Sequence, residues 1–413
     1  MATAGAVEDS ASLRALLGDA ADVAGLNVAC DVDNYDALLA AKLAKTRALF
    51  DAAGLHTPDP EVHESERSHF RQRAEFRVWH TGTKGEGGRM FFAMFPKGDK
   101  RTAVDIPQFP MGSRRINELM PKVLAFCRAR TVMHTRLYEA RFLTTLSGDS
   151  LITLIYHCKL EDEWREQAEI MAAELGVQLV GRSRKQKVVV GRDYVLEELH
   201  VGAKPSPSGV GAEEGSHTYK YRQAEGAFTQ PNAGVCQKML SFAQACTSRP
   251  SAEGAAAAEA DLCELYCGNG NFTCALAHNF RRVLGTEISR ASVMLAQHNL
   301  RENGLDNTAV CRMSAQEFGE AMRGERFFER LVHDKVDICS YGFRTLLVDP
   351  PRAGLDDGTR AIASMFPTVL YISCNPETMV RDIAAMGGAP PPPPCHATRH
   401  RPSRASSTPH GLG

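Results

Sequence analysis

The stretch Asp261-Leu-Cys-Glu-Leu-Tyr-Cys-Gly-Asn-Gly-Asn271 decides the fold of this chain. It starts as a short apolar run and breaks into Gly268-Asn-Gly270, and residues 272–278 follow with apolar positions at helical spacing. A strand, a glycine turn and a helix in this order open a doubly wound α/β fold that binds nucleotides. The glycines allow a sharp turn and a close approach of the backbone to a ligand.

A second apolar stretch, Val283-Leu-Gly-Thr-Glu287, ends in an acid that is suited to accept both hydroxyl groups of a ribose. The third glycine of the pyrophosphate fingerprint is absent, and Asn271 stands near its place. A ligand with a ribose but no phosphate therefore fits better than a dinucleotide, and S-adenosylmethionine is the common ligand of that kind. A dehydrogenase that binds NAD at this glycine turn is the alternative.

Two later apolar strands end in the polar motifs Asp349-Pro-Pro-Arg and Ser373-Cys-Asn-Pro. In open α/β sheets the ligand lies outside the carboxyl ends of the strands. The residues that we expect to meet in one crevice are Tyr266, Glu287, Asp349 and Cys374.

The composition is that of a soluble globular protein with room for two domains. The chain has 413 residues, of which 43% are hydrophobic and 23% charged. No apolar run is long enough to span a bilayer, and the first 25 residues carry acids that targeting peptides avoid. We expect a cytoplasmic monomer without a membrane partner, and organellar import stays open.

The 12 cysteines are scattered, without a Cys-x-x-Cys pair. This pattern is typical of reduced thiols, so we expect no metal, no iron–sulfur cluster and no disulfides. The net charge of −1 does not indicate a nucleic-acid partner, so the local distribution of charge has to be considered.

Basic and aromatic residues gather between residues 61 and 202. Residues 70–80 alternate as a strand with one basic face, and 89–95 can pair with it in a hairpin. Aromatic side chains on such a face stack unpaired bases, and arginines contact phosphates. An RNA-binding sheet is the functional interpretation, and a solvated strand face is the structural alternative.

A strand-end cysteine beside a methyl-donor site suits covalent catalysis. The C5 carbon of uracil is a poor nucleophile, but a thiolate that adds to C6 converts the ring into an enolate that can take a methyl group at C5. A base must then remove the C5 proton so that the thiolate leaves. The helix expected to begin near Pro376 favours the thiolate of Cys374 through its dipole. A buried, inert cysteine is the alternative.

Five ordered motifs closely resemble the RNA uracil-5-methyltransferase family, and within it the bacterial tRNA (uracil-5-)-methyltransferase branch. The resemblance runs from about residue 35 to Met386. The motifs are Phe228-Thr-Gln-Pro-Asn, Glu264-Leu-Tyr-Cys-Gly-Asn-Gly-Asn-Phe, Gly285-Thr-Glu-Ile, Val348-Asp-Pro-Pro-Arg and Ile372-Ser-Cys-Asn-Pro-Glu-Thr.

The resemblance implies S-adenosylmethionine as methyl donor, uridine 54 in the T-loop of tRNA as target, and Cys374 as nucleophile. The target base must be flipped out of its stack. The residues it assigns to S-adenosylmethionine are Gln230, Tyr266, Asn271, Glu287 and Asp349. Those it assigns to the T-arm of tRNA are Glu75, Arg77, Tyr138 and His157.

An rRNA uridine methyltransferase is the neighbouring alternative. That branch resembles this chain in the catalytic domain, but it usually carries an N-terminal RNA-binding barrel and an iron–sulfur cluster. A cluster needs grouped cysteines, and only Cys30 stands before Cys127. The tRNA branch therefore fits better.

The resemblance ends near Met386, whereas the family continues with two strands and a histidine-rich motif that holds the glutamate acting as general base. No Asp or Glu follows Asp382, so the general base is not found in this chain. We expect an exposed, aggregation-prone edge beside the Cys374 strand and slow turnover. A tRNA-binding protein impaired in catalysis is the alternative function. The change of composition after Met386 indicates an error in the gene model or a shortened isoform.

The fold class expected is a Rossmann-like doubly wound methyltransferase domain preceded by an α+β RNA-binding domain. The division is a helical segment at 1–60, the RNA-binding domain at 61–202, a loop at 203–218, the methyltransferase domain at 219–388 and a disordered tail at 389–413.

Overall fold

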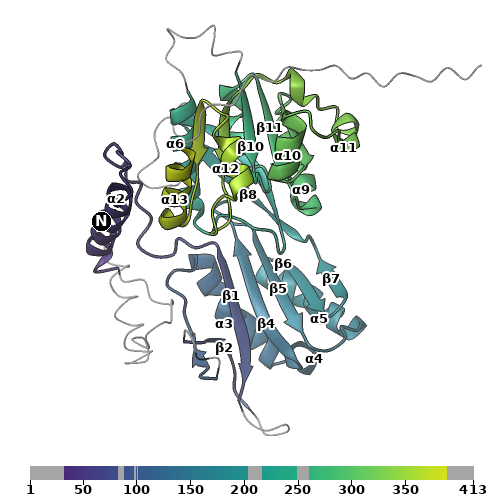
Figure 1. Cartoon of the computed structure of the whole chain (residues 1–413). Helices are drawn as coiled ribbons and strands as arrows, with labels where there is room; N and C mark the ends of the chain where they lie inside the picture. The colour runs from purple at the N-terminus through teal and green to yellow at the C-terminus, as the bar shows by residue number, and fades with distance from the viewer. Residues whose placement is uncertain are drawn as a thin grey trace, which may run out of the picture.

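The computed structural model describes residues 32–81, 88–96, 99, 101–202, 216–248 and 260–387. In these ranges the chain forms two lobes, one above the other in Figure 1, each built on its own large sheet. The first half of the expected helical segment, most of the expected loop at 203–218 and the expected tail at 389–413 lie outside the described residues.

The lower lobe carries a seven-stranded sheet with the order β3-β2-β1-β4-β5-β6-β7. Its strands are β1 Arg73–His80, β2 Met90–Met94, β3 Val104–Asp105, β4 Leu137–Thr144, β5 Ser150–Tyr156, β6 Gln178–Ser183 and β7 Gln186–Val190. The helices are α3 Arg114–Arg128, α4 Thr131–His134 and α5 Asp162–Leu175. The predicted hairpin is confirmed, since β1 pairs antiparallel with β2.

Alternation along β1 assigns its side chains to the two faces of the sheet. Ala74, Phe76 and Val78 are buried in the core that the sheet shares with α3 and α5. Because successive side chains of a strand point to opposite faces, Arg73, Glu75 and Arg77 lie on the other face. The basic face predicted from the sequence therefore exists.

The upper lobe carries a five-stranded parallel sheet with the order β12-β11-β10-β13-β14. Its strands are β10 Asp261–Leu265, β11 Arg282–Glu287, β12 Thr308–Arg312, β13 Phe343–Val348 and β14 Thr368–Tyr371. The chain runs outward from β10 to β12 and then returns to β13. Such a reversal of strand order opens the ligand crevice of a doubly wound fold, here at the carboxyl ends of β10 and β13.

Helices cover both faces of the parallel sheet. One core holds residues of α6 Ala233–Thr247, α8 Asn271–Leu276 and α9 Arg290–Glu302. The other holds residues of α10 Ala315–Met322, α11 Glu329–His333 and α12 Asp357–Ala363, with Met386 of α13 Pro376–Met386 packed against it. Short 3₁₀ turns lie at Ala277–Asn279 and Ile338–Ser340.

A two-stranded hairpin of β8 Tyr194–Val201 and β9 His217–Ala224 links the lobes. Val195 packs with Leu143 and Leu151 on the lower sheet, whereas Leu199 and Val201 lie in the upper core. The hairpin thus begins in one core and ends in the other. The domain division at 202 and 219 stays a prediction.

The helix α2 Tyr35–Ala52 lies beside α13 at the side of the upper lobe (Figure 1). Helix α6 begins at Ala233, two residues after Pro231. Asn232 caps it, because the Asn232 side chain accepts a hydrogen bond from the Val235 N–H at 2.9 Å. Within the described ranges, no helix is both long and apolar enough to cross a membrane.

Candidate active site

The carboxyl ends of four neighbouring strands lie level with one another. Leu265 at the end of β10 is in register with Thr286 of β11 and Val348 of β13, and Val348 is in register with Tyr371 of β14. The predicted residues Tyr266, Glu287 and Asp349 each follow one of these positions directly, and Cys374 comes three residues after Tyr371. The structure therefore brings these four residues to one edge of the sheet.

The turn after β10 is built from left-handed backbone. Tyr266, Gly268 and Gly270 have φ values of 63°, 56° and 80°. A Cβ added to Gly268 would meet no atom within 4 Å, whereas one added to Gly270 would lie 3.3 Å from the Cβ of Ala296. The turn therefore packs against α9 at Gly270, whereas unoccupied space adjoins it at Gly268.

Glu287 is tied to this turn by hydrogen bonds. Its Oε2 accepts one from the Gly268 N–H at 3.2 Å, and its Oε1 accepts one from the Ser289 N–H at 2.7 Å. A carboxylate oxygen can accept more than one hydrogen bond, so both oxygens keep capacity for ribose hydroxyls. The carboxylate is thus held in place beside the open side of the turn.

Gln230 and Asp349 meet although 119 residues separate them, with Gln230 Nε2 3.4 Å from Asp349 Oδ2. Burial raises the pKa of Asp349 to about 6. Asn271, at the start of α8, has its Nδ2 3.2 Å from the sulfur of Cys236. The five residues assigned to the cofactor are amides, acids and a phenol without a cation, a set that suits a ribose and a positive sulfonium better than a phosphate.

The loop that holds Cys374 is anchored to the loop after β13. Asn375 caps α13 by accepting from the Glu377 N–H at 3.2 Å, and its Nδ2 donates to the carbonyl oxygen of Arg352 at 3.1 Å. The Thr378 hydroxyl donates to the same oxygen at 3.3 Å. Cys374 itself is exposed, so the alternative of a buried cysteine is wrong, and its reactivity stays a prediction.

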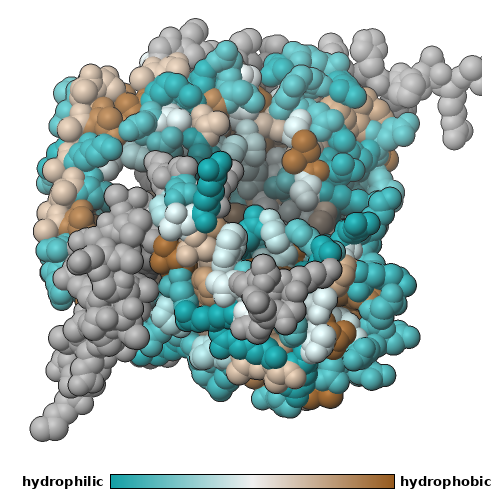
Figure 2. Space-filling view, turned by 90° about the horizontal axis from the view of Figure 1, so that it is seen from below, coloured by the Kyte–Doolittle hydropathy of each residue, from teal (hydrophilic) through white to brown (hydrophobic). Residues whose placement is uncertain are grey.

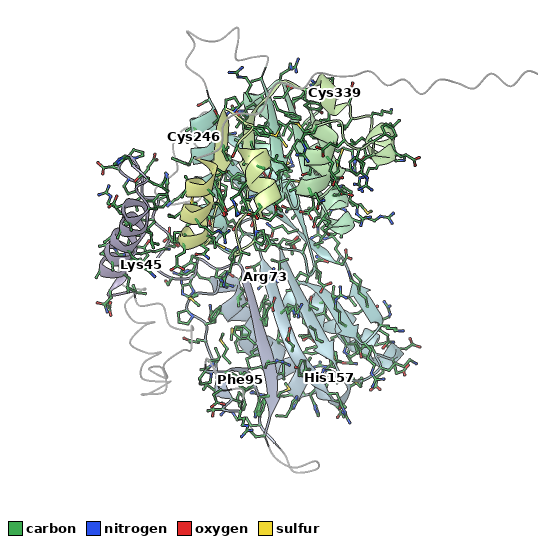
Figure 3. All side chains as sticks on the ribbon, viewed as in Figure 1. Lys45, Arg73, Phe95, His157, Cys246 and Cys339 are labelled. Carbon is green, nitrogen blue, oxygen red and sulfur yellow. The ribbon has the colours of Figure 1, made fainter. Side chains whose placement is uncertain are left out.

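Three of the four predicted RNA contacts touch one another on the lower lobe. The guanidinium carbon of Arg77 lies 3.7 Å from the ring centre of Tyr138, and the ring of His157 stacks on Tyr138 at 4.1 Å and 26°. Glu75 lies apart from them. Its Oε1 accepts a hydrogen bond from Arg73 at 2.9 Å. Figure 3 shows Arg73 near the junction of the lobes and His157 toward the far end of the lower lobe.

Sequence reasoning missed a cleft of about 490 Å³ at the junction of the lobes. Its lining includes Arg71, Arg73 and Phe228, and the side chain of Phe228 is 71% exposed. One feature of the sequence could have indicated this cleft: Phe228 stands two residues before Gln230, in the motif Phe228-Thr-Gln-Pro-Asn. The alternation that puts Arg71 and Arg73 on one strand face was another.

Comparison with known proteins identifies the family. The family model described as tRNA (Uracil-5-)-methyltransferase matches residues 34–388. The chain belongs to this family. Curated relatives named tRNA/tmRNA (uracil-C(5))-methyltransferase include one from Stutzerimonas stutzeri, 48% identical over 86% of this chain and 90% of the relative. Another, from Neisseria meningitidis, is 45% identical over 84% of this chain and 89% of the relative.

A solved structure shares the fold. It is that of Pyrococcus abyssi tRNA (uracil-54, C5)-methyltransferase in complex with S-adenosyl-L-homocysteine, with a TM-score of 0.56. It is 16% identical and covers 85% of this chain and 76% of its own. The family and the fold class predicted from the sequence are thus confirmed, and the roles of individual residues stay predictions.

Proposed function

We propose that this protein transfers a methyl group from S-adenosylmethionine to C5 of uridine 54 in the T-loop of tRNA, through a covalent bond between Cys374 and C6 of the uracil. Support comes from the names of its relatives and of the Pyrococcus abyssi structure. The observation that carries the proposal is the exposed Cys374 at the sheet edge where Glu287 and Asp349 also lie.

The cofactor would be held by Gln230, Tyr266, Asn271, Glu287 and Asp349. Glu287 would accept the ribose hydroxyls, and the open side of the turn at Gly268 leaves room for the nucleoside. Asp349 beside Gln230 would place negative charge near the sulfonium. When bound, S-adenosylmethionine supplies an electrophilic methyl group.

Cys374 would start the reaction by adding its thiolate to C6 of the uracil. The π electron pair of the C5–C6 bond would move toward O4 as an enolate. C5 would then take the methyl group while the bond from that group to the sulfonium sulfur breaks and leaves its electron pair on sulfur. The C5 proton next leaves to a base, the C5–C6 double bond re-forms and the thiolate is expelled. Among the described residues we assign no general base.

The RNA would bind across the face of the lower sheet that carries Arg77, Tyr138 and His157, with Glu75 nearer to the junction. The target uridine has to leave its stack to reach Cys374. The cleft at the junction, with the exposed Phe228 and the guanidinium groups of Arg71 and Arg73, lies on the way between the two lobes. These groups suit a flipped nucleotide and its phosphate.

The direct test is nucleoside analysis of unmodified tRNA after incubation with the protein and S-adenosylmethionine. We expect 5-methyluridine at position 54, no product when uridine 54 is replaced by cytidine, and no product in an rRNA fragment. Product in the rRNA fragment alone would favour the rRNA alternative. Tritium release from 5-tritiated uridine is a second readout, and binding of tRNA without product or release would favour a protein that binds tRNA without turnover.

A further inference from the structure

A pocket of about 690 Å³ opens on the lower lobe at the far end of β1. This volume lies in the range of roughly 300–1,000 Å³ that ligand pockets have. Four of its described lining residues are arginine or histidine, and none is acidic: Arg77, His80, Arg136 and His157. The pocket therefore favours an anionic ligand. Seen from below, this end of the molecule is mainly hydrophilic, with hydrophobic residues scattered among the described surface (Figure 2).

Tyr138 offers no open face to a ligand in this pocket. The guanidinium carbon of Arg77 and the ring centre of His157 lie 3.7 and 4.1 Å from the centre of the Tyr138 ring. Two groups this close to one ring centre would overlap if they shared a face. Arg77 and His157 therefore cover opposite faces of Tyr138, and a base can stack there only after one of them leaves.

Trp79 does offer an aromatic surface. It is 37% exposed, and it meets Phe95 edge to face, with ring centres 5.6 Å apart and an angle of 70° between the planes. Such a contact occupies at most one face of either ring. Trp79 stands two residues after Arg77 on β1, so both side chains lie on the same face of the sheet.

We propose that Trp79, with Phe95 as its side wall, is a stacking platform for an unpaired base of the RNA substrate. The stacked side chains of Arg77, Tyr138 and His157 then form the positively charged side of the pocket, which contacts the phosphates. The proposal rests on the proposed function for the identity of the RNA. An unpaired nucleotide fits this pocket for two reasons. Any base can stack on the aromatic ring of Trp79, and the charges of Arg77 and Arg136 can neutralise the phosphate of the RNA backbone.

Tryptophan fluorescence tests the platform directly, because the chain has two tryptophans and Trp164 is 1% exposed. A base that stacks on the indole of Trp79 quenches its emission. We expect a hairpin RNA with a T-arm sequence to quench the wild type, and a fully paired duplex to leave the emission unchanged. In Trp79→Phe the quench by the hairpin disappears, while anisotropy of labelled hairpin shows that binding persists.

Affinity supplies the second readout. Trp79→Ala should weaken hairpin binding by about 5- to 150-fold, the loss expected when one stacked base loses its partner. Phe327→Ala, which removes an aromatic ring that is 75% exposed on the upper lobe, should leave the affinity unchanged. Absence of quenching at saturating hairpin, or wild-type affinity in Trp79→Ala, would overturn the proposal. Neither readout needs methyl transfer, so quenching without 5-methyluridine supports the platform and counts against the proposed activity alone.

Discussion

Asp349 is a carboxyl group held partly out of water beside Gln230. Burial raises its pKa from the ordinary value of 3.8 to about 6. A carboxyl group whose pKa is raised in the folded state favours folding when protonated, so its contribution to stability is full below about pH 4 and is lost as pH rises through 6. At neutral pH the free protein thus carries a charge that opposes folding and that a bound cation can compensate.

We predict that Asp349→Asn raises the free energy of unfolding of the ligand-free protein by roughly 3 kcal/mol at pH 7, since each pKa unit corresponds to about 1.4 kcal/mol. The gain should shrink as pH falls toward 4, because the wild-type carboxyl group then becomes neutral. Urea unfolding at pH 7 and pH 4.5 measures both values. The exposed Asp306→Asn is the control and should show no gain; equal stability of Asp349→Asn and the wild type at pH 7 would contradict the account.

The place of Asp349 at the edge of the sheet could be predicted from its position after an apolar strand, but its contact with Gln230 could not. Strand order determines which carboxyl ends meet, and a single sequence gives no pairing between residues 119 positions apart. The stacking of Arg77 and His157 on Tyr138 could not be predicted for the same reason. It needs the register of β1 against β4 and of β4 against β5, which is set by packing.

At the scale of elements, the turn between β10 and α8 is the part that we propose to contact the cofactor most directly. Gly268 and Gly304 form a matched pair, since both have positive φ, 56° and 64°, and a Cβ added to either meets no atom within 4 Å. Alanine at either position suffers the same backbone strain, about 1–2 kcal/mol. The two glycines differ in that Gly268 lies beside the Glu287 carboxylate.

We predict that Gly268→Ala and Gly304→Ala destabilise the protein equally. Gly268→Ala alone should weaken the binding of S-adenosylhomocysteine, by about tenfold or more, because its added methyl group obstructs one contact with the ligand. Isothermal titration with each variant gives the affinities, and thermal unfolding gives the stabilities. Equal affinity of the two variants would mean that the turn does not face the ligand.

Elements with strong periodicity were predictable, and those set by distant pairing were not. Helix α5 and the β1–β2 hairpin follow from apolar spacing within one segment. Strand β3 has two residues, too few for any period to appear. The β8–β9 hairpin was missed because its apolar residues do not alternate with polar ones. In β8, Glu197 is buried on the inward face that also carries Val195, whereas Leu196 points outward and is exposed.

At the scale of the whole molecule, the proposed RNA contacts and the proposed cofactor contacts lie on different lobes. Arg77 belongs to the lower sheet, and Glu287 and Asp349 belong to the upper one. The net charge of −1 hides this arrangement, since the basic groups that we propose to meet RNA lie on one face of the lower sheet. Their contribution to binding should depend on salt because it releases counterions from the phosphates.

We predict that Arg77→Gln lowers tRNA affinity by about tenfold, reduces the slope of log affinity against log salt by about 1, and leaves the affinity for S-adenosylhomocysteine unchanged. Filter binding of tRNA between low and moderate salt measures the slope. Arg344→Gln, at the exposed opposite end of β13, is the matched control and should keep the wild-type slope. A parallel loss of cofactor affinity in Arg77→Gln would argue against separate sites.

Attack of Cys374 on the uracil can be tested by trapping the covalent adduct. A T-arm hairpin with 5-fluorouridine at the target position cannot lose its C5 substituent as a proton, so the adduct persists whichever base serves the enzyme. Denaturing gel electrophoresis with S-adenosylmethionine should show a shifted band for the wild type and for Cys339→Ala, which removes another exposed thiol. Cys374→Ala should show none. A shifted band in Cys374→Ala, or no band in the wild type at saturating hairpin, would contradict the account.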